Sequence, residues 1–277
     1  ADYVLFAGLQ ALAVVEAKKL RVDIAGVVSQ AERYSAGFSF GPGVEPCGGP
    51  WGKLKVPFVF ATNGRPYLKQ LDTKSGIWFR DVRRPENHPS ALPGWYSPAG
   101  LRKELEKDIP AADARLEETG PDSLDLELRP YQVDAIRAVE RAIAGGARSC
   151  LVAMATGTGK TRTAIGLVYR LISAKRFRRV LFLVDRTSLG IQAQDAFKEV
   201  HVENLQTFTE IFDLKGLQDV TVDADTKLHL STVQGMVRRI LNADTPEDVP
   251  TVDTYDCVVI DECHRGYGLD QELSDTE

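Results

Sequence analysis

The feature that most constrains the fold is a glycine-rich turn between an apolar run and a helix-forming stretch. The run Cys150–Met154 predicts a short buried strand, and Lys160–Ala174 has the apolar spacing of a helix. Between them, Gly157 and Gly159 allow backbone N–H groups to close around phosphate oxygens, and the helix N-terminus adds a partial positive charge. We therefore expect a phosphate-binding loop that consists of Thr156, Gly157, Thr158, Gly159, Lys160 and Thr161.

Lys160 and Thr161 are the residues of this loop that we expect to carry its chemistry. The lysine ammonium would reach the β- and γ-phosphates of a nucleotide, and the threonine hydroxyl would bind Mg²⁺. The strict loop pattern has a glycine where this chain has Met154. The alternative is a glycine-rich turn with an incidental lysine, which the acidic motif described next makes less attractive.

A second apolar segment, close to the C-terminus, ends in two adjacent carboxylates. Cys257–Ile260 predicts a buried strand, and Asp261 and Glu262 follow it directly. Ligands of open α/β sheets bind beyond the carboxyl ends of the strands, so both side chains would face a nucleotide. We expect Asp261 to hold Mg²⁺, Glu262 to orient and deprotonate the attacking water, and His264 to couple nucleotide state to another surface. The alternative is a strand that ends in a solvated acidic turn.

Apolar strands alternate with helices through the second half of the chain. This alternation predicts an α/β fold with a parallel sheet and helices on both of its faces. The helices are expected at residues 131–144, 160–174, 187–200 and 232–242. The strands are expected at residues 150–154, 180–184, 228–231 and 257–260.

The first part of the chain has a different, β-rich pattern. Tyr3–Phe6 and Ala11–Ala17 predict a hairpin, and an Asn-Gly turn between residues 58–62 and 67–71 predicts a second one. The other expected elements are a helix at 22–36, a loop at 37–57, a strand at 77–80, a connector at 85–98 and a short helix at 100–108. The pattern predicts a β-rich domain at 1–108, a polar linker at 109–128 and a parallel-sheet domain at 129–277.

Two carboxylates and a lysine come together in the first predicted hairpin. Glu16 and Lys18 are two residues apart, so their side chains share one face of a strand, and the hairpin brings Asp2 beside them. Such a set can bind Mg²⁺ and activate water against a phosphodiester. Gln30 and Tyr34 are four residues apart and share one face of the predicted helix. A Glu-x-Lys pair alone is a weak signal, because charged residues also end apolar strands by chance.

Composition excludes several classes of protein. Of 277 residues, 43% are hydrophobic and 26% are charged, which is typical of globular proteins and not of disordered chains. No apolar run approaches the roughly 18–20 residues that a membrane span needs, and no secretory signal precedes the first predicted strand. The four cysteines include no CxxC pair, which argues against a zinc site and against a disulfide framework. We therefore expect a cytoplasmic protein.

The net charge of −5 argues against a nucleic-acid partner, but the charge is not uniform along the chain. Residues 1–214 carry 29 Lys and Arg against 25 Asp and Glu, whereas residues 215–277 carry 5 against 14. The acidic excess is thus concentrated around the second motif. The basic residues, including Arg176, Arg178 and Arg179, are expected in the part that would meet DNA.

The phosphate loop and the acidic motif together resemble the first RecA-like lobe of a superfamily 2 helicase or translocase of the DExH type. A variant first glycine position, here Met154, is usual in that superfamily. Leu128–Gln132 resembles its adenine-reading segment, which implies that Gln132 hydrogen-bonds the base, although a helix entry with proline in its first turn fits as well. Two further segments resemble those that contact nucleic acid, and they imply that Arg186 and Thr232 bind backbone phosphates. Either residue could equally be a capping or surface residue.

The hairpin set resembles the PD-(D/E)xK nuclease core, with Asp2, Glu16 and Lys18 as its catalytic triad. Gln30 and Tyr34 match the Gln-x-x-x-Tyr helix of the RecB-like branch. The resemblance implies a mixed-sheet nuclease core and catalysis by these five residues, with Asp2 and Glu16 as the metal ligands. The family's helix with an upstream acidic residue would precede Asp2 and has no counterpart in this sequence.

A nuclease core followed by a DExH lobe resembles the restriction subunit, which carries motor and cleavage activities, of type I restriction–modification enzymes. Residues 74–83 and 176–186 add stretches that are specific to this family. The resemblance implies an ATP- and Mg²⁺-dependent translocase and endonuclease that cleaves unmodified double-stranded DNA away from the recognition site, with modification and specificity subunits as partners. Family members continue with a second RecA-like lobe, so we interpret the chain as a fragment with little ATPase activity of its own.

Two other classes of function stay open at this point. One is a different superfamily 2 nuclease–helicase of DNA repair or defence, which dependence on a DNA-methylating partner would distinguish. The other is a non-catalytic ATP-binding interaction module, in which the carboxylates are structural. We favour the enzyme because two independent chemical constellations occur in the order that one family uses.

Overall fold

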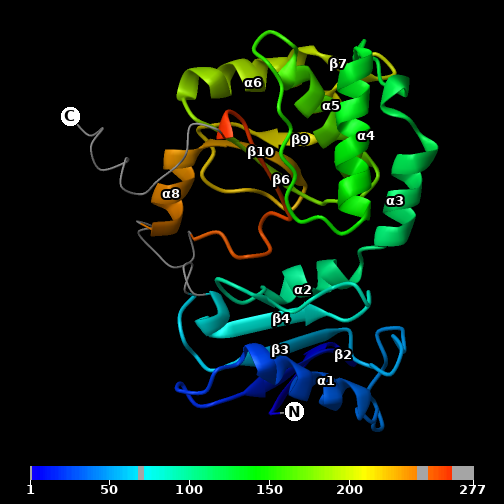
Figure 1. Cartoon of the computed structure of the whole chain (residues 1–277), viewed down its shortest axis with the longest axis vertical. Helices are drawn as coiled ribbons and strands as arrows, with labels where there is room; N and C mark the ends of the chain where they lie inside the picture. The colour runs from blue at the N-terminus through cyan, green and yellow to red at the C-terminus, as the bar shows by residue number, and fades with distance from the viewer. Residues whose placement is uncertain (1, 68–71, 242–248, 264–277) are drawn as a thin grey trace. The chain divides into compact units, whose positions relative to one another are not determined.

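The computed structural model describes residues 2–67, 72–241 and 249–263 (Figure 1). Contacts within the chain divide it into two compact units. Unit 1 contains the residues up to Lys107 together with Thr251–Thr254, and unit 2 contains Asp108–Pro250 and the residues from Tyr255 onward. Within the described ranges, no helix is long and apolar enough to cross a membrane.

Unit 1 is built on a mixed sheet. Its strands are β1 (Tyr3–Ala7), β2 (Gln10–Ala17), β3 (Phe58–Thr62), β4 (Ile77–Asp81) and β5 (Ser90–Ala91). They lie in the order β1-β2-β3-β4-β5, in which β2 and β3 are parallel and the other neighbours are antiparallel. β1 and β2 form the hairpin that the sequence predicted, and Gly8 in its turn has a φ of 61°. The sheet order therefore places β2 and β3 in its interior.

The apolar composition of β2 and β3 explains why both faces of this sheet are covered. On one face, Val14 packs against buried residues of α1 (Val28–Ala36). On the other face, Phe60 packs with Leu101 of α2 (Pro98–Leu105). A fully buried Phe side chain contributes about 1.5–3 kcal/mol, so the central strands hold the unit together. Two short 3₁₀ helices, η1 (Ala25–Val27) and η2 (Asp72–Lys74), complete its helical elements within the described residues.

The partner of β3 differs from the one that we expected. The Asn-Gly signal predicted that residues 58–62 pair with residues 67–71. In the structure β3 pairs with β4, and the N–H of Asn63 extends the ladder by donating to the carbonyl of Gly76 at 3.1 Å. Residues 68–71 lie outside the described residues. An Asn-Gly pair specifies a local bend, whereas packing on the sheet decides which later segment becomes the neighbour of a strand.

Unit 2 contains the parallel sheet that the alternation of strands and helices predicted. Its strands are β6 (Val180–Val184), β9 (Asp213–Lys215), β10 (Thr226–Thr232) and β11 (Cys257–Ile260), with a separate antiparallel pair of β7 (His201–Glu203) and β8 (Gln206–Thr207). The order is β11-β6-β10-β9, and all neighbours in it are parallel. Leu183 of β6 pairs with Ile260 on one side and with Ser231 on the other, so three strands end at one edge.

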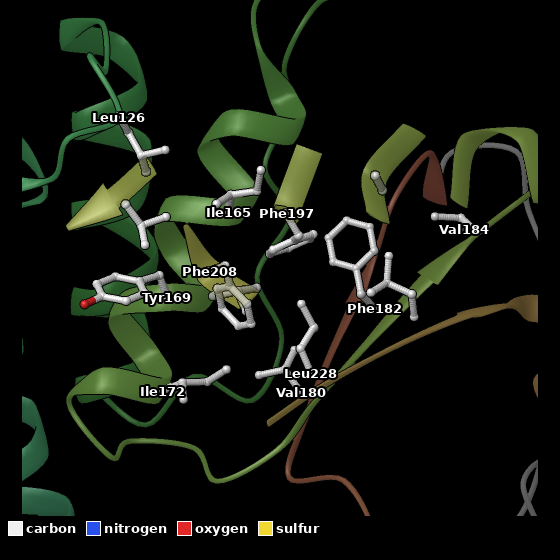
Figure 2. Close-up of a cluster of buried hydrophobic side chains, with 14 residues drawn as sticks. Leu126, Ile165, Tyr169, Ile172, Val180, Phe182, Val184, Phe197, Phe208 and Leu228 are labelled. Carbon is white, nitrogen blue, oxygen red and sulfur yellow. The ribbon is translucent and has the colours of Figure 1, made fainter. Parts of the chain in front are cut away.

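Helices and sheet in unit 2 share one hydrophobic core, which Figure 2 shows. The helices are α3 (Ile109–Glu118), α4 (Pro130–Ala144), α5 (Lys160–Ser173), α6 (Thr187–Glu199), α7 (Phe208–Ile211) and α8 (Val233–Leu241), with the 3₁₀ helix η3 (Pro121–Ser123). Phe197 of α6 contacts Phe182 and Phe208 edge to face, with ring centroids 5.8 and 5.1 Å apart. Ile165 of α5 and Leu228 of β10 belong to the same cluster.

Residues 109–128, which we expected to be a linker, contain α3 and η3 and belong to unit 2. Arg170 of α5 is buried, donates to the carbonyl of Leu116 at 2.7 Å and pairs with buried Glu140 of α4 at 2.6 Å. Pro110 lies in the first turn of α3, where a missing N–H breaks no helical hydrogen bond. Proline and polar residues thus indicated a linker where they start a helix.

The apolar run before the phosphate loop is not a strand, which corrects our expectation for residues 150–154. The run has no regular secondary structure, and Leu151 is 81% exposed. β11 takes the position beside β6 at that edge of the sheet. A short apolar run favours burial but does not specify which position in a sheet it occupies.

Candidate functional sites

The phosphate loop of unit 2 has a backbone that glycine adopts most easily. Gly157 and Gly159 have φ angles of 78° and 80°, in the left-handed region. Gly159 is the N-cap of α5, and a Cβ on it would lie only 2.5 Å from Nε2 of Gln132. The left-handed φ therefore favours glycine at both positions, and any other residue at 159 would also displace the Gln132 amide. The other residues of the expected loop are exposed or half-buried, and they are Thr156, Thr158, Lys160 and Thr161.

Gln132, which the resemblance assigned to a nucleotide base, is buried against the loop. Its Nε2 donates to the carbonyls of Thr158 and Gly159 at 3.1 and 3.2 Å. Its Oε1 accepts the N–H of Arg129 at 2.8 Å, which caps the start of α4. A small pocket of about 160 Å³ opens beside it and is lined by Glu127, Arg129, Gln132, Gly157, Thr158, Gly159 and Arg162. The amide of Gln132 thus positions the loop in this structure.

Lys160 and Glu262 bring the two motifs of unit 2 together. Their side chains form an ion pair across 102 positions of sequence. The N–H of Asp261 donates to the carbonyl of Leu183 at 2.9 Å and so continues the β11–β6 ladder. Oδ1 of Asp261 accepts the N–H of Glu262 at 2.9 Å, and Glu262 has a φ of 52°, which turns the chain directly after the strand. His264 lies outside the described residues.

The oxygen donors at this site suit a hard cation that also binds phosphates. The hydroxyl of Thr161 and the carboxylate of Asp261 are ligand types that Mg²⁺ prefers. In the part of the chain that the structure describes, no group of three or more His, Cys, Asp or Glu side chains is placed to hold a metal. Mg²⁺ commonly binds through one or two carboxylates plus nucleotide phosphates, so these residues fit a metal–nucleotide complex.

Arg186 and Thr232 lie at the carboxyl ends of two neighbouring strands, β6 and β10. Thr232 pairs with Val184 in the β10–β6 register, and Arg186 comes two residues after Val184. The Arg186 side chain is 70% exposed, with Nε 3.4 Å from the carboxylate of Asp185. Oγ1 of Thr232 accepts the N–H of Gly235 at 3.0 Å and so occupies a capping position for α8. The exposed guanidinium at this edge is accessible to a phosphate.

The basic cluster before β6 serves the fold, which corrects its expected place at a DNA surface. Arg176 is buried and pairs with Asp113 at 2.8 Å. Arg179 is buried and its guanidinium donates to backbone carbonyls at and before the start of β10, and this burial lowers its pKa. The N–H groups of Arg178 and Arg179 both donate to the carboxylate of Asp256, at 2.8 and 2.9 Å. The sequence shows only the charge of these residues, whereas their contacts show that the side chains of Arg176 and Arg179 are buried.

Unit 1 brings the residues of the expected nuclease site together around Glu16. Nζ of Lys18 lies 2.5 Å and Nε2 of Gln30 lies 2.7 Å from the same oxygen, Oε1 of Glu16. Gln30 also donates to the hydroxyl of Tyr34 at 3.3 Å, as their spacing on one helix face allows. Oδ2 of Asp2 accepts the N–H of the residue after Glu16 at 2.7 Å, so Asp2 lies across the hairpin from it.

One buried carboxylate oxygen at this site lacks a hydrogen-bond partner among the described residues. Glu16 is 2% exposed, and within the described residues its Oε2 has no hydrogen-bond partner. An unpaired buried polar atom costs on the order of 1–3 kcal/mol, and a bound cation would offset that cost. The carboxylates of Asp2 and Glu16 are donors of the type that Mg²⁺ binds. The hydrogen bond to Glu16 raises the pKa of Lys18, so its ammonium stays charged at neutral pH.

Trp78 lies on the same sheet face as Glu16, and sequence reasoning missed it. Glu16 pairs with Ala61 and Ala61 pairs with Trp78, so the three side chains form a row across β2, β3 and β4. Among the described residues, Nε1 of Trp78 is buried without a hydrogen-bond partner. Residues 74–83 include a stretch that resembles the family. An aromatic residue in an apolar strand, however, indicates by itself only burial in the core.

Comparison with known proteins matches both units. Residues 1–105 match the family model of the type I restriction enzyme EcoKI endonuclease subunit second domain, and residues 125–272 match that of the type III restriction enzyme, res subunit. The chain is 45% identical over 299 residues to the type I restriction enzyme EcoKI endonuclease subunit of Escherichia coli (strain K12), with 100% of this chain and 25% of that protein covered. It is 30% identical over 247 residues to the EcoAI endonuclease subunit of Escherichia coli, with 88% and 28% covered.

A solved structure adds one further likeness. A fragment of a putative HsdR subunit of a type I restriction enzyme from Vibrio vulnificus YJ016 is 25% identical, with 92% of this chain and 39% of that chain covered and a TM-score of 0.34. That score is too low to relate the two arrangements. The chain spans about a quarter of the length of the curated relatives described above.

Proposed function

This chain belongs to the family of type I restriction enzyme endonuclease subunits, and we propose that it contributes the nuclease and the first motor lobe of an ATP-dependent DNA translocase. The whole enzyme would cleave unmodified double-stranded DNA away from its recognition site. The observation that carries this proposal is the presence of two separate polar clusters in one chain. One surrounds Glu16 in unit 1, and the other joins Lys160 to Glu262 in unit 2.

In unit 1 we propose a PD-(D/E)xK nuclease core at residues 1–108, with Mg²⁺ held by Asp2 and Glu16. When bound, the cation polarises the phosphodiester and lowers the pKa of a bound water. Lys18 and Gln30 fix Oε1 of Glu16, which supports the assignment of Oε2 as the metal-binding oxygen. The charged ammonium of Lys18 would stabilise the negative charge that develops on the phosphate.

Tyr34 completes the proposed nuclease set as a positioning residue. Its hydroxyl receives a hydrogen bond from Gln30, and Gln30 in turn donates to Glu16. Both Tyr34 and Gln30 come from α1, so the helix and β2 orient the carboxylate jointly. A carboxylate held from two elements keeps its geometry, which a metal-dependent site requires.

In unit 2 we propose a RecA-like lobe at residues 129–277 that binds ATP at the phosphate loop. Lys160 would bind the β- and γ-phosphates, while Thr161 and Asp261 would hold Mg²⁺, which would supply positive charge that neutralises the phosphates. Glu262 would orient and deprotonate the attacking water. As parts of the same proposal, Gln132 would hydrogen-bond the adenine base, and His264 would couple the nucleotide state to another surface.

The partners in this proposal are DNA and the other subunits of the enzyme. Arg186 and Thr232 would contact backbone phosphates of duplex DNA, which is supported by their shared edge and by the exposure of Arg186. Modification and specificity subunits would anchor the complex at its recognition site. The cytoplasm is the proposed location, because the substrate is DNA inside the cell.

A pair of variants in the intact endonuclease subunit, assembled with its partner subunits, tests the proposal. Glu16→Gln is expected to keep ATP hydrolysis and translocation but to lose cleavage of unmodified circular DNA. Lys160→Ala is expected to lose translocation and, with it, distant cleavage, although unit 1 stays folded. Cleavage by Glu16→Gln at the wild-type rate would place the nuclease elsewhere, and normal translocation by Lys160→Ala would overturn the motor assignment.

A further inference from the structure

The chain makes a tight, basic turn immediately after the strand that carries Glu16. The N–H of Val22 donates to the carbonyl of Lys19 at 2.9 Å, which leaves Arg21 at the tip of the turn. Lys19 and Arg21 are exposed, and among the described residues neither side chain forms an ion pair. Two cations are thus presented to solvent within five residues of the catalytic carboxylate.

This turn is held rigidly against the end of β3. Nε of Arg65 donates to the carbonyl of Leu20 at 2.6 Å, and Nδ2 of Asn63 donates to the carbonyl of Val22 at 2.7 Å. The loop that carries Arg65 is itself packed on Gly76, where an added Cβ would lie 1.9 Å from the Arg65 carbonyl oxygen. Because the backbone is fixed by these contacts, the turn can bind a ligand with little loss of conformational entropy.

Two further cations join the same surface through a shared carboxylate. Arg65 and Lys74 both pair with Asp23, at 3.0 and 2.5 Å. We call Lys19, Arg21, Arg65 and Lys74 the basic patch, in which two of the four cations pair with the carboxylate of Asp23. Ion pairs at exposed positions are worth only about 0–1 kcal/mol, so Lys74 can exchange Asp23 for a phosphate.

We infer that the basic patch binds the phosphate backbone of duplex DNA beside the phosphodiester that is cut, an inference that rests on the proposed nuclease function. Duplex DNA carries one negative charge per roughly 1.7 Å of its axis, so several phosphates would lie within reach of a surface of this kind. Lysine and arginine contacts to phosphates fix the position of DNA but read no sequence. This suits a nuclease whose cleavage point is set by a motor and not by the local bases.

Binding of a short duplex to the 277-residue chain measures this contact directly. The double variant Lys19→Gln/Arg21→Gln is expected to weaken binding about tenfold near 0.1 M salt and to reduce the slope of log affinity against log salt by about 2. Asp23→Asn, which removes the carboxylate of the patch, is expected to tighten binding. Fluorescence anisotropy with a labelled duplex of about 20 base pairs at several KCl concentrations gives both quantities.

Lys53 provides the matched control. It is exposed in the turn before β3, which lies at the opposite end of the parallel β2–β3 pair from Glu16, because Phe58 pairs with Ala13. Lys53→Gln should leave the affinity and the salt slope unchanged. An unchanged affinity and slope in the double variant, or an equal loss in Lys53→Gln, would overturn the inference.

Cleavage by the intact enzyme separates this inference from the proposed function. The double variant Lys19→Gln/Arg21→Gln should translocate normally and cut DNA about tenfold more slowly, whereas Glu16→Gln should not cut. Normal cleavage by the double variant with none by Glu16→Gln would overturn the role of the basic patch and leave the nuclease assignment standing. Cleavage by Glu16→Gln would instead overturn the nuclease assignment.

Discussion

The ammonium of Lys160 and the carboxylate of Glu262 are paired in unit 2, so the phosphate loop and the acidic end of β11 contact each other directly. Both side chains are partly buried, at 30% and 21% exposure. The carboxylate of Glu262 competes with a nucleotide phosphate for the ammonium of Lys160. We therefore expect nucleotide binding to weaken or replace the pair of Lys160 with Glu262.

This exchange predicts that Glu262→Gln tightens ATP binding to the 277-residue chain. The variant removes the competing carboxylate and a negative charge beside the phosphates, and a partly exposed pair is worth about 0.2–1 kcal/mol, which corresponds to roughly 1.5- to 5-fold in affinity. Isothermal titration calorimetry with Mg²⁺ and ATP measures the change. Lys160→Ala is the control and should weaken binding at least tenfold; weaker binding by Glu262→Gln would contradict the exchange.

The buried pair of Arg170 and Glu140 predicts a large stability effect in unit 2. Arg170→Met leaves the charge of Glu140 buried without its partner, which is expected to lower the free energy of unfolding by about 3–5 kcal/mol. Urea denaturation followed by circular dichroism measures it. The exposed pair of Arg137 and Asp122 is the control. Arg137→Ala should lower the free energy of unfolding by less than about 1 kcal/mol. Similar costs for the two substitutions would show that the buried pair contributes little.

His229 predicts a pH dependence of stability. Burial, together with the neighbouring cation of Arg239, lowers its pKa to about 4 from an unfolded value of 6.5. The neutral ring contacts the hydroxyl of Tyr255 at 2.5 Å and the carbonyl of Asp219 at 3.1 Å. The unfolded chain therefore binds the proton more tightly, so stability is complete above pH 6.5 and is lost as the pH falls toward 4.

The titration of His229 is expected to lower the free energy of unfolding by roughly 2–3 kcal/mol at acidic pH. Chemical denaturation at about pH 7.5 and about pH 4.5 measures it in the wild type and in His229→Gln. The variant should lose less stability between the two pH values, because the titration of other groups is common to both proteins. An equal loss in both would assign the acid sensitivity to other groups.

The 277-residue chain is expected to bind ATP without efficient turnover. The proposed function assigns to these residues the first of two RecA-like lobes, and phosphoryl transfer would also need a charge-stabilising arginine from the second lobe. A malachite-green assay of phosphate release, with and without duplex DNA, checks this. Brisk DNA-stimulated hydrolysis by the chain alone would show that these residues suffice for catalysis.

Much of the fold follows from local pattern. The apolar runs of β2, β3 and β6 and the helical spacing of α4, α5 and α6 predicted elements that the structure contains within a few residues. The predictions were wrong where one local signal is compatible with two structures. The apolar run at 150–154 lies outside the sheet, and the Asn-Gly turn at 63–64 does not join β3 to the next apolar segment.

The candidate sites, like the fold, could be predicted from the sequence only in part. Spacing alone placed Glu16 and Lys18 on one strand face and Gln30 and Tyr34 on one helix face, and the structure brings the two faces together. Spacing did not reveal that Oε2 of Glu16 has no hydrogen-bond partner among the described residues. That property depends on every group packed around the carboxylate, which includes residues from several elements.

The sequence by itself determined many of the elements and the chemical groups that stand at their ends, because periodicity and turn chemistry act over a few residues. Only the tertiary structure decided the partners of those groups. Arg179 turns inward to carbonyls near the start of β10, whereas Arg21 faces solvent, although both are arginines in basic stretches. The physical reason is that burial and ion pairing depend on contacts between distant segments, such as that of Lys160 with Glu262, and no local pattern encodes such a contact.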